Sequence, residues 1–246
     1  RDVAVTGVQT CALPICSSGQ FTVEPFFKVS YDMARDFAGI TQVTTMPFVL
    51  SVNPKVPAAN VNDLIAMAKA KPGSLNYPSS GDGSPPHVVM EMFNIESGVK
   101  IVHVPYKTVQ QATADLLGNH VQVMMIVATA LSPLLQNNSV RPLAVSSTRR
   151  SPFLPDVPTL QEATGLPIPG ADAWNGFCAP AGTPAPVINK LYREIVAIIR
   201  TPEITKRLGA LTNEVVGSSP EEFSAFMRAE RAKWFKYAKI LNVVPQ

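Results

Sequence analysis

The chain has 246 residues, 46% of them hydrophobic and 16% charged, with a formal net charge of +3 at pH 7. This composition is typical of a folded globular protein and excludes an intrinsically disordered chain. The charge is small and forms no Lys/Arg cluster with interleaved aromatic residues, which argues against a nucleic acid partner.

Residues 1–16 differ in origin from the rest of the sequence. Residues 5–15 read VTGVQTCALPI, which matches the in-frame translation of a common short-read sequencing adapter. Segments of this kind are set aside before the fold is considered. We therefore expect residues 1–16 to be a non-native segment that packs poorly, with native sequence resuming near Ser17. Cys178 is then left alone, and no disulfide is predicted.

The first native elements are expected to be a short helix at residues 21–27 and a strand at residues 44–52. A helix at residues 61–70 follows. Its apolar residues are spaced to form one face, and Pro72 and Gly73 come directly after its end.

The most informative segment is residues 71–87, KPGSLNYPSSGDGSPPH. It predicts a buried strand at 75–77, a Ser/Gly loop, and a helix that opens at Ser84 and ends near Gly98. Ser84 suits the N-cap and Pro85 the first helical position. Small residues at a helix N-terminus leave N–H groups and hydroxyls free to hold an anion, although a well-capped turn is an equally simple interpretation.

A second strand–helix unit and a third strand follow this loop. Residues 100–107 predict a second strand ending in a Pro-Tyr-Lys turn, then a helix from Val109 to Gly118, then a third strand at 121–127. This alternation indicates a parallel sheet with crossover helices, in which ligands bind at the carboxyl ends of the strands. The loops at 79–84, 105–108 and 127–129 all lie at those ends.

The C-terminal part predicts strands at 140–146 and 173–180, joined by a Pro-rich connection. Thr183 is expected to cap a helix whose core face carries Val187, Leu191, Ile195 and Ile198. A capping box at residues 219–222 opens the last helix. Its buried side is expected to carry Phe223, Phe226, Met227, Trp234 and Leu241.

Metal and catalytic motifs are absent from the sequence pattern. His87, His103 and His120 have no metal-ligand spacing, so neither a metal nor another cofactor is expected. His87 alone has a ligand role in this interpretation, and His103 is expected in the core. The loop is neither G-x-S-x-G nor G-x-G-x-x-G. An α/β enzyme would require His87 or His103 within hydrogen-bond reach of a loop serine.

Several separated motifs occur together: KPGSLNYPSSGDGSPPHVVMEMF, VHVPYK, ADLLGNHVQVMM, RSPFLPDVPTLQEATGLP, WNGFCAPAGTP and VGSSPEEFSAFMRAERAKW. In this order they resemble the substrate-binding proteins of tripartite tricarboxylate transporters, also called Bug receptors. The resemblance covers nearly all of residues 17–246. It implies a two-lobed α/β periplasmic binding protein fold of type II with an incomplete first lobe. Residues 17–46 and 174–246 would be the remnant of lobe 1, and residues 47–173 would be lobe 2.

The function implied by this resemblance is that of a periplasmic, monomeric receptor without catalytic activity. It would capture a small carboxylate, such as a di- or tricarboxylate, an amino acid or an aromatic acid, and deliver it to membrane permease subunits. A ligand-sensing domain of the same fold, acting in regulation, remains an alternative, as does an α/β enzyme. The export signal and the first ligand loop of the family are expected to be missing from this sequence.

The resemblance also suggests the ligand contacts. The anion donors would be Ser79, Ser80, Gly81, Gly83 and Ser84, with first-lobe contacts from Ser17 and Ser18. Further candidates are Asp82, His87, Tyr106, Lys107, Thr129 and Trp174, the last either lining the cleft or buried beside it. Three positions depart from the family pattern: Thr108, Asp82 and Ile126. Asp82 would either point to solvent or pair with a cationic group of the ligand, because a carboxylate repels a dianion.

Overall fold

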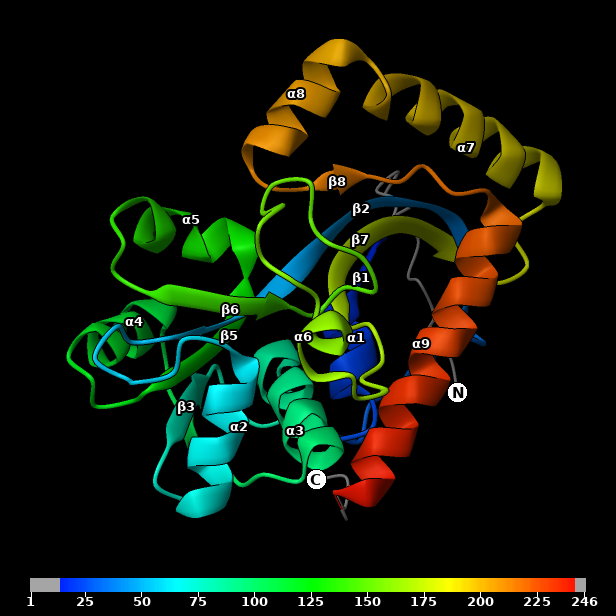
Figure 1. Ribbon diagram of the computed structural model, residues 1–246. Helices are drawn as coiled ribbons and strands as arrows, with labels where there is room; N and C mark the ends of the chain where they lie inside the picture. The colour runs from blue at the N-terminus through cyan, green and yellow to red at the C-terminus, as the bar shows by residue number, and fades with distance from the viewer. Residues whose placement is uncertain (1–13, 242–246) are drawn as a thin grey trace.

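One long strand, β2 (Phe37–Val52), connects two halves of the chain in the computed structural model, which describes residues 14–241 (Figure 1). Residues 37–47 of β2 pair with β7 (Asp172–Pro180). Residues 48–52 pair with β5 (Val123–Val127), and β6 (Arg141–Val145) pairs with the same end of β2. We call the two parts the β7 half and the β5 half. The strand expected at 44–52 is confirmed and begins earlier.

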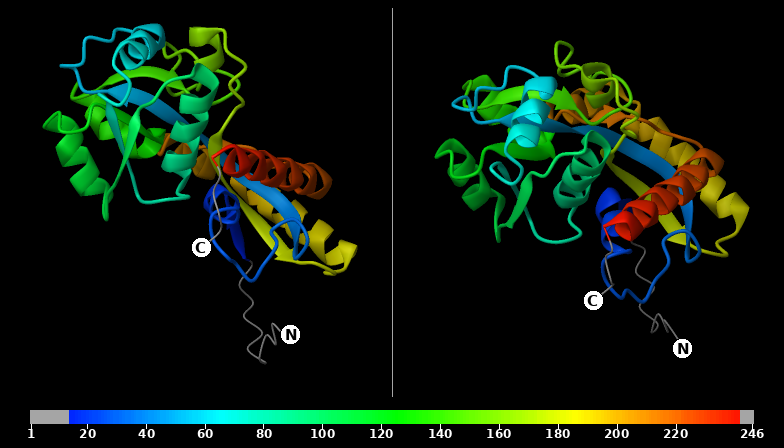
Figure 2. Two further views of the ribbon diagram at one scale, coloured as in Figure 1. Left: turned by 90° about the horizontal axis from the view of Figure 1, so that it is seen from below. Right: turned by 60° about the horizontal axis from the view of Figure 1, so that its bottom comes forward.

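The β7 half is a sheet covered by helices. Beside β7 and β2 it contains β1 (Ile15–Ser17) and β8 (Glu214–Val215). Its helices are α1 (Ser18–Val23), α7 (Ala185–Ile199), α8 (Pro202–Ala210) and α9 (Pro220–Ile240). Figure 2 shows α7 and α9 alongside the β2–β7 ribbon, with the helices of the other half gathered at the far end of β2.

The expectation that Cys178 stands alone is wrong. β1 pairs antiparallel with β7, and this register brings Cys16 opposite Gly176. The pairing leaves the α-carbons of Cys16 and Cys178 6.0 Å apart, and the two residues form a disulfide. Cys16 is 1% exposed, so it is well packed, contrary to the expectation for residues 1–16, whereas Ile15 is 61% exposed. Residues 1–13 lie outside the described part of the chain.

The β5 half contains the strand–helix units predicted from the sequence. They are α2 (Val61–Ala70), β3 (Asn76–Ser79), α3 (Pro85–Ser97), β4 (Val102–Pro105), α4 (Val109–Leu117), β5, α5 (Ala128–Gln136), β6 and α6 (Leu160–Thr164). β3 and β4 are parallel, as expected. The third strand departs from the prediction, because β5 pairs antiparallel with β2 in the large sheet, whereas β3 and β4 form a separate two-stranded sheet.

Capping residues in the sequence predicted most of the helix ends correctly. Ser84 precedes α3, and Gly98 ends it in the left-handed conformation with φ 63°. The capping box of α9 is present between Ser219 and Glu222. Two positions differ: α1 begins earlier than the helix expected at 21–27, and α7 begins after Pro184, where Thr183 instead donates its hydroxyl to the Pro180 carbonyl.

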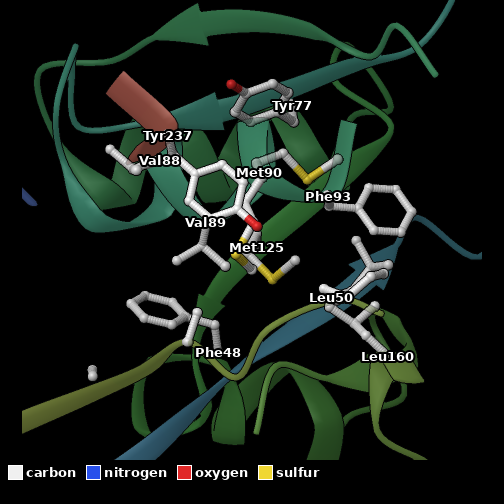
Figure 3. Packing of buried hydrophobic residues seen from close by; sticks show 14 of the residues in the cluster. Phe48, Leu50, Tyr77, Val88, Val89, Met90, Phe93, Met125, Leu160 and Tyr237 are labelled. Atoms are coloured by element: carbon white, nitrogen blue, oxygen red, sulfur yellow. The ribbon is translucent and has the colours of Figure 1, made fainter. Parts of the chain in front are cut away.

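A large hydrophobic cluster joins the two halves (Figure 3). Phe48 and Leu50 of β2, Met125 of β5, the buried face of α3 and Tyr237 of α9 all belong to it. The Tyr237 hydroxyl also donates to Glu96 Oε1 at 2.8 Å. Packing of this kind ties α9 to the β5 half.

The residues predicted to be buried on the C-terminal helices are confirmed only in part. Phe223, Met227 and Trp234 of α9 are fully buried. On α7, Val187 is 47% and Ile198 58% exposed, so their assignment to the core face is wrong. Among residues 14–241, no helix combines the length and the apolar character that crossing a membrane requires.

Candidate functional site: a pocket at the strand ends of the β5 half

A pocket of about 260 Å³ lies where β3 and β5 end and where α3, α4 and α5 begin. Its lining comes mostly from these elements, with Phe48 from β2, Ser18 from α1 and Ala173 from β7. The other lining residues are Pro78, Ser79, Ser80, Pro85, Pro86, Thr108, Val109, Ala112, Met124, Met125, Ile126, Val127 and Ala130. The position agrees with the rule that ligands bind outside the carboxyl ends of strands.

The loop at 79–84 forms one edge of this pocket, and its backbone is held by its own hydrogen bonds. The Gly81 N–H donates to Ser79 Oγ at 3.0 Å, and the Ser84 N–H donates to the Gly81 carbonyl at 3.2 Å. The Gly83 N–H donates to His87 Nδ1 at 3.1 Å. Three N–H groups that the sequence suggested as anion donors are therefore already engaged inside the loop.

Both loop glycines have positive φ, 113° at Gly81 and 72° at Gly83. Only glycine adopts such angles without strain. At Gly83 a Cβ atom would also meet Phe26 Cβ at 3.0 Å, whereas nothing lies within 4 Å of a Cβ at Gly81. Gly83 therefore packs against the segment that follows α1, and that contact brings the β7 half to the edge of the loop.

Three serines line the pocket, and the hydroxyl of one of them, Ser79, is already engaged with the Gly81 carbonyl at 3.1 Å and with His103. Ser79 and Ser80 both line it, Ser79 being 5% exposed and Ser80 open to solvent. Ser18, 5% exposed, lines it from the other half. Ser84 precedes α3 but does not cap it with its side chain, because its hydroxyl donates to the Gly81 carbonyl at 2.6 Å.

Behind the loop, two histidines and an aspartate come together. His103 Nε2 lies 2.5 Å from Ser79 Oγ, and its Nδ1 lies 3.5 Å from Asp82 Oδ1. The rings of His87 and His103 lie 4.2 Å apart between centroids. As expected, His103 is largely buried and hydrogen-bonded, its side chain being 15% exposed, and the parallel register of β3 and β4 places it opposite Tyr77, directly before the loop.

The environment keeps both imidazoles neutral near pH 7. Burial, reinforced by the neighbouring His103, lowers the pKa of His87 to about 4, and the Asp82 carboxylate opposes this only in part. Burial also lowers the pKa of His103, again against the influence of Asp82. The Asp82 side chain is 71% exposed, so it follows the first of the two expected alternatives and faces solvent.

Asp82, His87 and His103 also offer ligand atoms within 4.8 Å of one another, a geometry that the sequence spacing did not reveal. The hydrogen bonds nevertheless argue against a metal centre. Because the Gly83 N–H donates to His87 Nδ1, the neutral His87 carries its proton on Nε2 and has no free lone pair for a metal. The group is better described as a hydrogen-bonded support for the loop.

Two other predicted ligand residues lie away from the pocket. Trp174 is 1% exposed and donates its indole N–H to Glu230 Oε2 at 3.3 Å, so it is buried and does not line this pocket. The Thr129 hydroxyl donates to the Leu211 carbonyl. Thr129 thereby contacts the connection between α8 and β8, outside the described lining of the pocket.

Three further candidates also lie outside the described lining. The Tyr106 hydroxyl donates to Asp115 Oδ2 at 2.6 Å, which fixes the Pro-Tyr-Lys turn against α4. Lys107 is exposed at the same turn. Ser17 belongs to the capping box of α1, with its N–H donating to Gln20 Oε1 at 2.6 Å.

Sequence reasoning missed the apolar part of the pocket. Phe48, Met124 and Met125 lie in predicted strands without having been predicted as site residues, and each is at most 2% exposed. A buried apolar residue that faces a cavity has the same sequence pattern as one that faces the core. Only the convergence of β5 with α4 and α5 distinguishes the two.

The comparisons with known proteins agree with one another. The family described as "Tripartite tricarboxylate transporter family receptor" matches residues 10–243. A UPF0065 protein in the tcbD-tcbE intergenic region of Pseudomonas sp. is 32% identical over 90% of this chain and 67% of its own. Protein BugT of Bordetella pertussis is 30% identical over 84% of this chain and 63% of its own. The chain thus spans about two thirds of the length of these curated relatives.

Solved structures show the same similarity. The structure titled R. palustris Rpa4515 with adipate has a TM-score of 0.81 and 32% identity, covering 94% of this chain and 78% of that one. The periplasmic binding protein BugD has a TM-score of 0.79 and 28% identity over the same shares. MatC from Rhodopseudomonas palustris, with bound malate, has a TM-score of 0.77 and 25% identity, covering 91% and 78%.

Proposed function

Because this chain belongs to the tripartite tricarboxylate transporter receptor family, we propose that it binds a small carboxylate in the strand-end pocket and releases it to a membrane permease. It has the two-lobed type II fold of the family's periplasmic binding proteins. The periplasm is the compartment in which a receptor of this family acts, and we place the function of this chain there.

The location of the pocket carries the proposal. Ser79, Ser80 and Ser18 line it from both halves of the chain. A carboxylate held between such donors makes charge-assisted hydrogen bonds, which are shorter and stronger than neutral ones. Adipate and malate in the titles of two similar structures support the choice of a carboxylate.

The arrangement of the two halves supports a closing motion. The ligand would contact Ser18 from α1 and the loop at 79–84 at the same time. A ligand that contacts both sides only in the closed state shifts the population toward that state. β2 and β7 run side by side between the halves and are the elements about which they would rotate. A permease could then distinguish the loaded receptor by its shape.

The hydrogen-bonded pair of Ser79 and His103 meets the geometric condition set above for an α/β enzyme. The family and the similar structures are solute-binding receptors and not enzymes. The pair therefore has a structural role in this account: it fixes the hydroxyl of Ser79 at the edge of the pocket. No catalytic residue is assigned.

Isothermal titration calorimetry on the purified 246-residue chain tests the proposal. We expect hexanoate or another short-chain carboxylate to bind and the neutral isostere hexanamide to bind far more weakly. Val109→Trp, at a 45% exposed position that lines the pocket, should abolish binding. Val187→Trp, 47% exposed on α7 and outside the described lining, is the matched control. Equal loss in both variants, or binding of hexanamide alone, would contradict the proposal.

A further inference from the structure

We propose that Thr129 is a positioning residue for ligand binding, although it lies outside the described lining of the pocket. Its hydroxyl holds the first turn of α5, which forms part of the pocket wall, against the end of α8 in the other half of the chain. The inference rests on the proposed function and concerns how the two halves are held together around a bound ligand.

Thr129 lies between two residues of the pocket wall. Val127 directly precedes α5 and Ala130 belongs to its first turn, and both line the pocket. Successive residues of a helix are rotated by roughly 100°, so the side chain of Thr129 leaves α5 in a different direction from that of Ala130. It reaches the β7 half, while its neighbours in sequence remain at the pocket. A displacement of Thr129 therefore moves the wall itself.

The hydroxyl of Thr129 makes two hydrogen bonds to the C-terminal end of α8. It donates to the carbonyl of Leu211, the C-cap residue of α8. Because the Thr129 hydroxyl has one proton, it is the acceptor in its second contact, in which the Thr212 hydroxyl donates across 2.9 Å. The last carbonyls of a helix have no partner within the helix, so Thr129 supplies a donor from the other half.

Thr212 occupies a position that favours glycine. Its φ is 54°, in the left-handed region, which a β-branched residue adopts only under strain. The Thr212 N–H donates to the Gly209 carbonyl at 2.9 Å. The Asn213 N–H donates to the Leu208 carbonyl at 3.0 Å, which completes a Schellman motif at the end of α8. Glycine would fit this motif without strain, but it would lack the hydroxyl that contacts Thr129.

A second polar contact joins the same part of the β7 half to the β5 half. Arg149, in the loop after β6, forms an ion pair with Glu214 of β8. The Arg149 side chain is 65% exposed and Thr129 is half-buried, so water can replace both contacts at little cost when the halves move apart. The buried apolar cluster between the halves has no such substitute. The contact between Thr129 and α8 is therefore suited to form and break during closing.

Ligand binding and the Thr129 contact favour the same state. A ligand that touches the pocket from both halves requires the halves to be close together, and so do the hydrogen bonds between Thr129 and the end of α8. Each contact therefore stabilises the state in which the other forms. Loss of the Thr129 hydroxyl should weaken ligand binding by roughly three- to tenfold, the factor that corresponds to one net hydrogen bond.

Calorimetric titrations of the full chain with hexanoate and with adipate test this role. We expect Thr129→Val to bind these acids roughly three- to tenfold more weakly, and Thr129→Ser, which keeps the hydroxyl, to bind them as tightly as the unmodified chain. The ligand-free chain should lose little stability, because Asn213 Nδ2 also donates to the Leu211 carbonyl at 2.9 Å.

Thr201→Val is the matched control. The Thr201 hydroxyl also donates to a carbonyl near a helix end, that of Ile198 in α7 at 2.8 Å, but both residues belong to the β7 half. We expect the affinity for both acids to be unchanged in this variant. A loss of affinity equal to that of Thr129→Val would show that any such hydroxyl acts through the fold, and would overturn the inference.

Thr212→Gly distinguishes this role from a structural one. It removes both the strain and the hydroxyl, so we expect the melting temperature of the ligand-free chain to rise while the affinity falls. In the double variant with Thr129→Val, the affinity should fall no further than in Thr129→Val alone, because the two residues act in one contact.

Three results would overturn the inference and leave the proposed function standing. They are an unchanged affinity in Thr129→Val, a loss of both stability and affinity in Thr212→Gly, and additive losses of affinity in the double variant. If neither hexanoate nor adipate binds to the unmodified chain, the proposed function fails and the inference fails with it.

Discussion

The two ends of the pocket are built in different ways. The loop end depends on single hydrogen bonds and on two glycines with positive φ, supported by a pair of neutral histidines. The β5 wall depends on packed side chains such as Met124 and Met125, which contribute no hydrogen bond to the ligand. Under the proposed function, the loop end would fix the orientation of the ligand and the wall would contact its body. Substitutions at the two ends of the pocket should therefore differ in their effects on stability and on ligand affinity.

The largest effect is expected at Gly83 in the loop. Gly83→Ala places a Cβ 3.0 Å from Phe26 Cβ in a residue with positive φ, and we expect it to lower the free energy of unfolding by about 3–5 kcal/mol. Gly81→Ala introduces the same backbone strain at positive φ, but its Cβ meets no neighbour within 4 Å. We expect it to lower the free energy of unfolding by about 1–2 kcal/mol. Urea unfolding measures both. Equal losses would show that the contact with Phe26 does not support the loop.

The histidine pair predicts how stability depends on pH. His87 has a pKa of about 4 when folded and about 6.5 when unfolded, so between these values the unfolded chain binds a proton that the folded chain does not. Stability should thus fall as the pH drops from about 6.5 to about 4, by on the order of 3 kcal/mol. Asp82 and His103 are the titratable groups that face it. In the His87→Gln variant, the free energy of unfolding should change less between about pH 6.5 and about pH 4. An unchanged pH dependence would mean that another group causes the loss of stability.

Substitutions at the two loop serines should distinguish a residue that stabilises the loop from one that only binds the ligand. Ser79→Ala removes the partner of the Gly81 N–H and of His103, so we expect a loss of about 1–2 kcal/mol in stability together with roughly tenfold weaker ligand binding. Ser80 lines the pocket and is exposed, so Ser80→Ala should weaken binding by a few-fold, about 1 kcal/mol, without destabilising the fold. Thermal unfolding and calorimetry on the same samples check both expectations. A Ser80→Ala variant as unstable as Ser79→Ala would remove the distinction.

The smallest effect is expected on the apolar wall. Ile126→Val removes one methylene from a lining residue, and we expect hexanoate to bind about two- to fourfold more weakly, with a stability loss of about 0.5–1.5 kcal/mol. Ile168→Val makes the same change at a residue that is 5% exposed and outside the described lining. It should cost similar stability and leave the affinity unchanged. Similar affinity losses in both variants would mean that Ile126 acts through the fold alone.

Much of the β5 half could be predicted because its signals are local. The helix at 61–70 was predicted with its observed bounds, since its apolar residues form one face and a Pro-Gly stop follows directly. The start of α3 after Ser84 and its end at Gly98 follow from capping preferences in the same way. The position of the anion loop at a strand end was therefore available from the sequence.

The features that the sequence did not reveal depend on distant pairing. The contact between Ser79 and His103 follows from the register of β3 with β4, which no local pattern specifies. The disulfide depends on β1 pairing with β7, at a sequence separation of 162. Val187 and Ile198 of α7 have helical spacing, yet they lie at the margin of the apolar stripe and remain exposed. Periodicity predicts that a face exists but not how much of it is covered.

The orientation of a bound monocarboxylate tests the central claim most directly. Nuclear Overhauser effects can be measured between the chain, with labelled Ile and Met methyl groups, and hexanoate labelled at carbon 2 or at carbon 6. The account predicts that carbon 6 contacts the methyl groups of Met124, Met125 and Ile126 along β5, while carbon 2 lies near Ser79 and Ser80. Carbon 2 against the β5 methyl groups, or contacts only outside this pocket, would contradict it.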